Sequence, residues 1–167
     1  MKRILIIFSL IICVSATSGW AANQKESVLI TNSWVRMQPL SRPNSAAYMT
    51  LENKTQDDIV LKTVTSHSVA TIELHSMEHI NGMMKMRQIK DIKIPAKGKV
   101  ELKPGGFHLM LFGIEKPLNN GETIEMVLHF DNGTESTVQA KVKDPDDLMT
   151  AQSTQETQTT GSKMHGQ

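Results

Sequence analysis

Cysteine and aromatic residues are scarce in this chain of 167 residues, which has one cysteine and only 4% Phe, Trp and Tyr. The cysteine, Cys13, lies in an apolar N-terminal run that we expect to be removed, so the mature protein has no thiol. Such a protein has no disulfide, no cysteine nucleophile and no thiolate metal ligand. The blue-copper electron-transfer site, which needs one Cys beside two His, is therefore excluded.

An excess of charge of one sign is also lacking. Lys and Arg total 18, and Asp and Glu total 17. Loss of the basic start of the chain would leave one more acidic than basic residue. No basic field is then present to attract nucleic acid or an anionic membrane surface. We therefore expect no nucleic-acid partner.

Residues 1–21 are typical of a cleaved secretory signal peptide, with a basic start followed by an apolar run at 4–14. This run is shorter than the about 20 residues that a membrane-spanning helix needs. Lipidation at Cys13 is disfavoured because the bulky Ile12 precedes it. We expect an exported protein with no membrane span after cleavage.

No part of the chain shows sustained helical periodicity, and turn residues separate short apolar runs. We expect residues 25–143 to form one domain, which is long enough for a single core. Residues 144–167 are polar and predict a disordered tail that ends in a Met-His pair. Seven to nine short strands predict an antiparallel β-sandwich. The predicted strands are 28–37, 46–51, 59–65, 71–77, 85–94, 99–102, 108–112, 123–130 and 134–142.

Histidine and methionine gather in the segment 75–110. Leucines alternate with them in two predicted strands, and successive side chains of a strand point to opposite faces. If the leucines face the core, the opposite face carries His75 and Met77 on one strand, with His108 and Met110 on the other. Imidazole suits copper, and thioether sulfur selects Cu(I). The pattern therefore predicts a soft-metal site on this face of the sheet.

The other histidines and methionines are less informative. We assign Met49 and Met126 to the core, because Met commonly fills apolar interiors, and His67 and His129 to the surface. The sequence leaves open whether four residues beside the predicted site contact metal: Met77, His79, Met83 and Met84.

Four of these residues have a spacing that resembles a family signature. Ten residues separate His75 from Met86, twenty-one separate Met86 from His108, and one separates His108 from Met110. The pattern His-x10-Met-x21-His-x-Met resembles that of the periplasmic copper chaperones of the PCuAC family. The resemblance covers about residues 27 to 140 and includes the flanking words Trp34-Val-Arg36, Ala46-Ala-Tyr-Met49, Ile72-Glu-Leu-His75 and Leu102-Lys-Pro-Gly-Gly106.

This resemblance implies a cupredoxin-like, Greek-key β-sandwich that binds one Cu(I) through His75, Met86, His108 and Met110. It also implies delivery of copper to an acceptor such as the CuA subunit of cytochrome c oxidase or a Sco-type protein. We expect a monomer. We also expect no enzymatic activity, because thioethers are poor ligands for the zinc of a hydrolase. Copper buffering or resistance, or a sandwich module that binds no metal, remain as alternatives. The tail pair Met164 and His165 would give at most a weak second copper site.

Overall fold

The computed structural model describes residues 27–38, 44–80 and 82–144, so the expected signal peptide and residues 145–167 of the tail lie outside it. The described residues form β-strands and no helix, which confirms the all-β prediction. No described helix is long and apolar enough to cross a membrane. The ten strands in these ranges are β1 (Val28–Arg36), β2 (Ser45–Asn53), β3 (Ile59–Thr65), β4 (Val69–Ile80), β5 (Met83–Gln88), β6 (Ile92–Ile94), β7 (Lys99–Leu102), β8 (His108–Ile114), β9 (Thr123–Phe130) and β10 (Glu135–Lys143).

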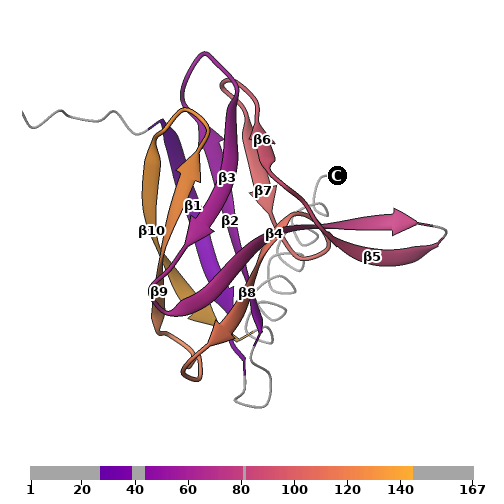
Figure 1. Ribbon diagram of the computed structural model, residues 1–167, viewed down its shortest axis with the longest axis vertical. Helices are drawn as coiled ribbons and strands as arrows, with labels where there is room; N and C mark the ends of the chain where they lie inside the picture. Colours follow the sequence, from indigo (N-terminus) through magenta and orange to yellow (C-terminus); the bar gives the residue numbers. More distant parts are fainter. Residues whose placement is uncertain (1–26, 39–43, 81, 145–167) are drawn as a thin grey trace, which may run out of the picture.

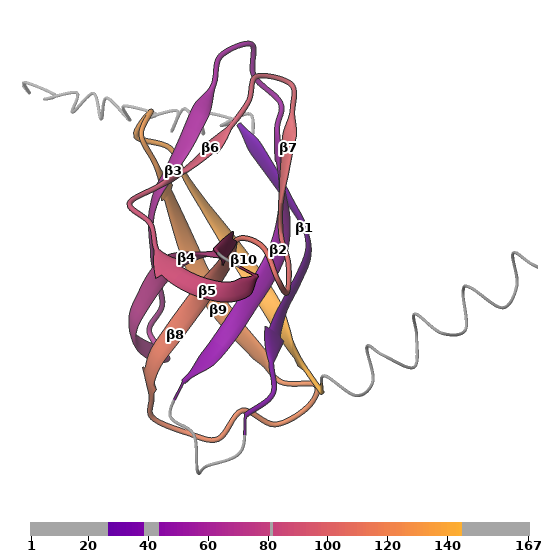
Figure 2. The ribbon, with the colours of Figure 1, turned by 90° about the vertical axis from the view of Figure 1, so that its right-hand side faces the viewer.

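The strands form one curved sheet in the order β5-β4-β8-β2-β1-β10-β9-β3-β6, and β7 pairs with the part of β2 that β8 leaves free. Figures 1 and 2 show that the sheet folds over, so that β3 and β6 face β2 and β7. Among the described strands β1 and β10 run parallel, which is an exception to the antiparallel pairing expected from the sequence. Their pairing joins the first and last strands of the domain.

The core consists of apolar side chains that alternate along the strands. In β10, Val138, Ala140 and Val142 are buried, while the residues between them are exposed. This period of two is what a strand with one covered face requires. Met49 and Met126 are 1% and 0% exposed, which confirms their assignment to the core.

Three predicted strands match the structure at both ends: Ile59–Thr65, Lys99–Leu102 and Thr123–Phe130. The prediction of one continuous strand over 85–94 is wrong. The chain breaks after β5, where the Ile89 amide donates to the Leu74 carbonyl at 2.9 Å. The break is necessary because β5 pairs with β4 whereas β6 pairs with β3, on a different part of the sheet.

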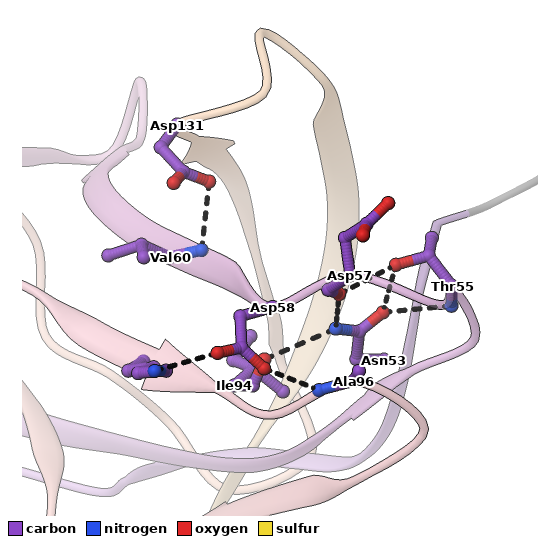
Figure 3. Close-up of polar contacts among 9 residues, drawn as sticks. Asn53, Thr55, Asp57, Asp58, Val60, Ile94, Ala96 and Asp131 are labelled. Atoms are coloured by element: carbon purple, nitrogen blue, oxygen red, sulfur yellow. Dashed lines mark hydrogen bonds and ion pairs between the residues drawn. The ribbon is translucent and has the colours of Figure 1, made fainter.

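Polar contacts fix the loop between β2 and β3 (Figure 3). The buried Asn53 donates from Nδ2 to the carbonyl oxygens of Asp57, at 2.8 Å, and Ile94, at 3.2 Å. Its Oδ1 accepts from the amide and the hydroxyl of Thr55, at 2.9 and 2.8 Å. One amide side chain therefore satisfies four polar groups and joins the loop to β6.

Asp58, in the same loop, predicts a pH dependence of stability. Its carboxylate accepts from Lys93 Nζ at 2.7 Å and from the Ala96 amide at 2.9 Å (Figure 3). These hydrogen bonds, the one from Lys93 first, hold the pKa of Asp58 below its usual value. A carboxyl with a lowered folded-state pKa stabilises the fold above its unfolded pKa, and this contribution is lost as the pH falls through the folded pKa.

We therefore expect the free energy of unfolding to depend less on pH in Asp58→Asn than in the native chain, between about pH 5 and pH 2. Urea unfolding at closely spaced pH values measures this slope. Lys93→Met removes the main hydrogen-bond partner of Asp58 and should also reduce the pH dependence of the free energy of unfolding. An unchanged slope in both variants would contradict the assignment.

Candidate metal centre

The two histidines of the predicted site lie side by side. His75 on β4 is directly opposite His108 on β8, and the centroids of their rings are 5.7 Å apart. This placement arises because Leu74 and Leu109, which pair in the next row, point into the core. The alternation seen in the sequence thus placed both imidazoles on the face away from the core leucines.

The two methionines of the predicted set occupy different rows of this face. Met110 is half-buried, lies two residues from His108 on the same strand and is opposite Glu73. Met86 lies within β5, opposite Met77, and is 52% exposed. The register therefore places each methionine two residues away from the row of the histidine pair and on opposite sides of it, Met110 beside Glu73 and Met86 beside Met77.

Hydrogen bonds fix which nitrogen of each ring is available. His108 is 5% exposed, and its Nδ1 donates to the Gly106 carbonyl at 3.0 Å, so Nε2 carries the lone pair. His75 donates from Nε2 to the Glu73 carboxylate at 2.8 Å. His75 Nδ1 is buried and has no hydrogen-bond partner in the described structure. Each ring thus keeps one nitrogen that can donate to a metal ion, as metal-binding imidazoles do when a neighbour holds the other nitrogen.

Aromatic rings surround the imidazoles. The Tyr48 ring lies 6.4 Å from the His108 ring and 4.3 Å from the Trp34 ring, and Phe112 lies 6.4 Å from His75. Burial raises the pKa of Tyr48, against the opposing effect of Arg36. Neutral rings therefore lie beside both imidazoles.

Strands β4 and β5 form a hairpin that projects from the body of the protein (Figure 1). His79 and Met84 are directly opposite each other near its end, and His79 Nδ1 contacts Met84 Sδ. Both are exposed, as is Met83. The hairpin thus carries further imidazole and thioether groups beyond the two histidines.

Sequence reasoning missed several residues around the site. It gave Glu73 no role, although its spacing of two residues from His75 puts both side chains on one face of a strand and was a usable signal. The carbonyl of Gly106 carries no side-chain signal at all, and Tyr48 became relevant only when β2 was found beside β8. His67 is exposed, and His129 is half-buried between Thr65 and Glu135.

Fold and site together define a cupredoxin-like β-domain with a cluster of soft donor atoms on one face. No group of three or more His, Cys, Asp or Glu residues in the described ranges is arranged to hold a metal. The donor groups on this face are two imidazoles and the thioether of Met110, a set that suits a soft ion such as Cu(I) better than Mg²⁺ or Ca²⁺.

The chain belongs to the LpqE-like family, whose model, described as "Putative lipoprotein LpqE-like", matches residues 28–142. A Leifsonia xyli protein named "Putative lipoprotein Lxx21020" is 30% identical over 130 residues, which is 77% of each chain. An uncharacterized protein of Rickettsia prowazekii is 30% identical over 140 residues, with the same coverage of both chains.

Solved structures confirm the resemblance to the PCuAC family. The copper-bound PCuAC domain from PmoF2 is 26% identical, with a TM-score of 0.60, and the match covers 71% of this chain and 94% of that domain. The Cu(I) form of DR1885 from Deinococcus radiodurans is 32% identical, with a TM-score of 0.57 and coverage of 72% and 83%.

Proposed function

We propose that this protein is a periplasmic copper chaperone that carries one Cu(I) at the face shared by β4 and β8. The observation that carries the proposal is the pair His75 and His108, each with one nitrogen held by a neighbour and the other free to donate. Met110 adds a thioether on the same face. The copper-bound relatives support the choice of copper as the cargo.

The ligands we propose are His75 through Nδ1, His108 through Nε2, and the sulfurs of Met110 and Met86. The first three lie on the body of the sheet, whereas Met86 comes from the projecting hairpin. A set of neutral donors leaves the charge of Cu(I) uncompensated, so the ion is held less firmly than by thiolates. Such binding allows capture of the ion and its later transfer to a partner.

A carrier fits the exposure of the site better than an enzyme does. Met86 is 52% exposed, so an acceptor protein can reach the ligand set from the side of the hairpin. The oxidising cell envelope would turn thiols into disulfides, whereas thioethers cannot pair in this way. A carrier with no thiol in its mature form is therefore suited to this compartment.

We further propose that residues 1–21 direct export and are cleaved, that residues 25–143 form the copper-binding domain, and that 144–167 form the polar tail. The acceptor in this proposal is the CuA subunit of cytochrome c oxidase or a Sco-type protein. Copper buffering is the second candidate, because the same soft, exposed donor set would also sequester free Cu(I).

Two measurements test the proposal. Titration of the mature protein with Cu(I) against a competing chelator should show at least one tightly held ion per chain. The loaded protein should then transfer copper to an apo CuA domain or to an apo Sco-type protein. Absence of tight binding would overturn the proposal, and tight binding without transfer to either acceptor would favour buffering.

Met86→Ala and Met110→Ala should weaken Cu(I) binding much more than they lower stability. Neither side chain is fully buried, so its loss leaves little cavity. Met126→Ala is the matched control, because this core methionine is 0% exposed and its loss should cost about 2–5 kcal/mol without changing affinity. Chelator competition and urea unfolding on the same samples measure both quantities. Large destabilisation with native affinity in the first two variants would place these residues in the core.

Glu73→Ala should weaken Cu(I) binding by roughly 10–100-fold, the range for residues that orient a metal-binding imidazole. The physical reason is the loss of the acceptor for His75 Nε2, which frees the ring to rotate. Glu73→Gln keeps an oxygen acceptor and should recover most of the affinity. Equal loss in both variants would mean that Glu73 acts through its charge and does not orient the ring.

A further inference from the structure

The β4–β5 hairpin segregates its side chains by chemistry. The register places His79 opposite Met84 and Met77 opposite Met86, and these alternate residues share one side of the hairpin. We call these four residues the hairpin donor face. The side chains of the intervening residues point to the other side, where Glu78 is opposite Lys85 and Ser76 is opposite Arg87. One side of the hairpin therefore carries charged side chains, and the other side presents the thioethers and imidazole of the hairpin donor face, with Gln88 beyond it, opposite His75.

Packing does not explain the hairpin donor face. Met84 and Met86 are 46% and 52% exposed, and all six residues of β5 are exposed. A core methionine such as Met126 is 0% exposed and is held among apolar neighbours. Exposed thioethers gain little from burial, so the hairpin donor face contributes little to the stability of the domain.

Contacts on this face suit a soft ion. His79 Nδ1 contacts Met84 Sδ directly, so the two donors are already brought together across the strands. Met77 is two residues from His79 on the same face, a spacing of about 7 Å that flexible side chains can bridge. The hairpin donor face has no carboxylate, which disfavours Mg²⁺ and Ca²⁺, and its sulfurs favour Cu(I).

We infer that the hairpin carries a second Cu(I) site, formed by His79, Met84 and Met77, outside the site at His75 and His108. The inference rests on the proposed copper cargo and extends it with an outer site. Met86 lies opposite Met77 and also belongs to the inner ligand set, so it connects the two sites. Copper enters and leaves through the exposed outer site, and each step along the face is a short transfer between neighbouring soft donors.

The experiment is an anaerobic Cu(I) titration of the full mature chain labelled with ¹³C at the methionine methyl groups. The first equivalent should shift the Met110 resonance, and a second, weaker equivalent should shift Met84 and Met77. The variant His79→Ala with Met84→Leu should bind one equivalent, with its first affinity within roughly twofold of native, because neither substituted residue belongs to the inner ligand set. Met83→Leu is the matched control, since Met83 is exposed on the same hairpin but points to the other side; it should still bind two.

Two further variants separate the possible failures. The variant His75→Ala with His108→Ala should lose the tight site and still shift Met84 on binding one Cu(I). If it does not, the outer site is overturned whatever the inner site does. If the native chain binds no tight copper but Met84 still responds, the inner-site proposal fails and the outer site stands.

Met164→Leu with His165→Ala, in the tail, should leave the second equivalent in place. Its loss there would assign that copper to the tail and overturn the inference.

Discussion

His108→Ala should weaken Cu(I) binding by more than roughly 100-fold, which exceeds the loss typical of a residue that only orients a ligand. The reason is that Nε2 of this buried ring is the free donor fixed by the bond from Nδ1 to Gly106. His75→Ala should have a comparable effect, since it removes the buried Nδ1 that has no partner in the described structure. Competition with a Cu(I) chelator at constant pH measures both losses.

His67→Ala is the control for these two variants, because His67 is an exposed histidine outside the site. It should leave the affinity unchanged. Unfolding of the apo proteins must be measured in parallel, since His108 is buried and its loss also removes a hydrogen bond. Retained affinity in a folded His75→Ala or His108→Ala variant would remove that histidine from the ligand set.

Asn53→Ala should lower the free energy of unfolding by about 2–4 kcal/mol, because it removes several hydrogen bonds and leaves a buried carbonyl without a partner. The side chain is 1% exposed and reaches both Asp57 and Ile94 (Figure 3). Asn53→Asp should be at least as damaging, because it brings a carboxylate oxygen against two carbonyl oxygens. Urea unfolding at neutral pH gives the values.

Gln56→Ala, in the same loop, is the matched control, since an exposed side chain of this kind should change stability by less than about 0.5 kcal/mol. The Asn53 variants that still fold should bind Cu(I) with native affinity. Asn53 is the last residue of β2, whereas β8 pairs with the first residues of that strand. A strong loss of copper affinity in folded Asn53→Ala would show that this loop and the site are coupled. A free energy of unfolding within about 0.5 kcal/mol of the native value in Asn53→Ala would contradict the stabilising role of the Asn53 hydrogen bonds.

Alternation of apolar and polar residues was sufficient to predict most strands and the face on which the two histidines lie. Leu74 and Leu109 determine that face, because burying them leaves His75 and His108 only the other side. The parallel pairing of β1 with β10 could not be predicted in this way, since alternation records which face is buried and not which strands are neighbours.

Other features of the site were beyond sequence reasoning for physical reasons. The free nitrogen of each imidazole depends on hydrogen bonds, and one of the partners is a backbone carbonyl, Gly106. The position of Met86 depends on the register of β5 against β4, which the sequence treated as part of one longer strand. The spacing of the motif predicted membership in the ligand set but not that Met86 and Met110 lie on opposite sides of the histidine pair.

Strand β5 pairs only with β4 at the edge of the sheet, and none of its side chains is buried. Its separation from β4 would therefore expose no core, and the free energy of this local opening is a small part of that for global unfolding. Met86 moves with β5, whereas His75, His108 and Met110 belong to strands paired with the body. In the proposed ligand set, local opening of this hairpin would withdraw Met86 and leave His75, His108 and Met110 in place, so the affinity for a bound ion could fall while the rest of the domain stays folded.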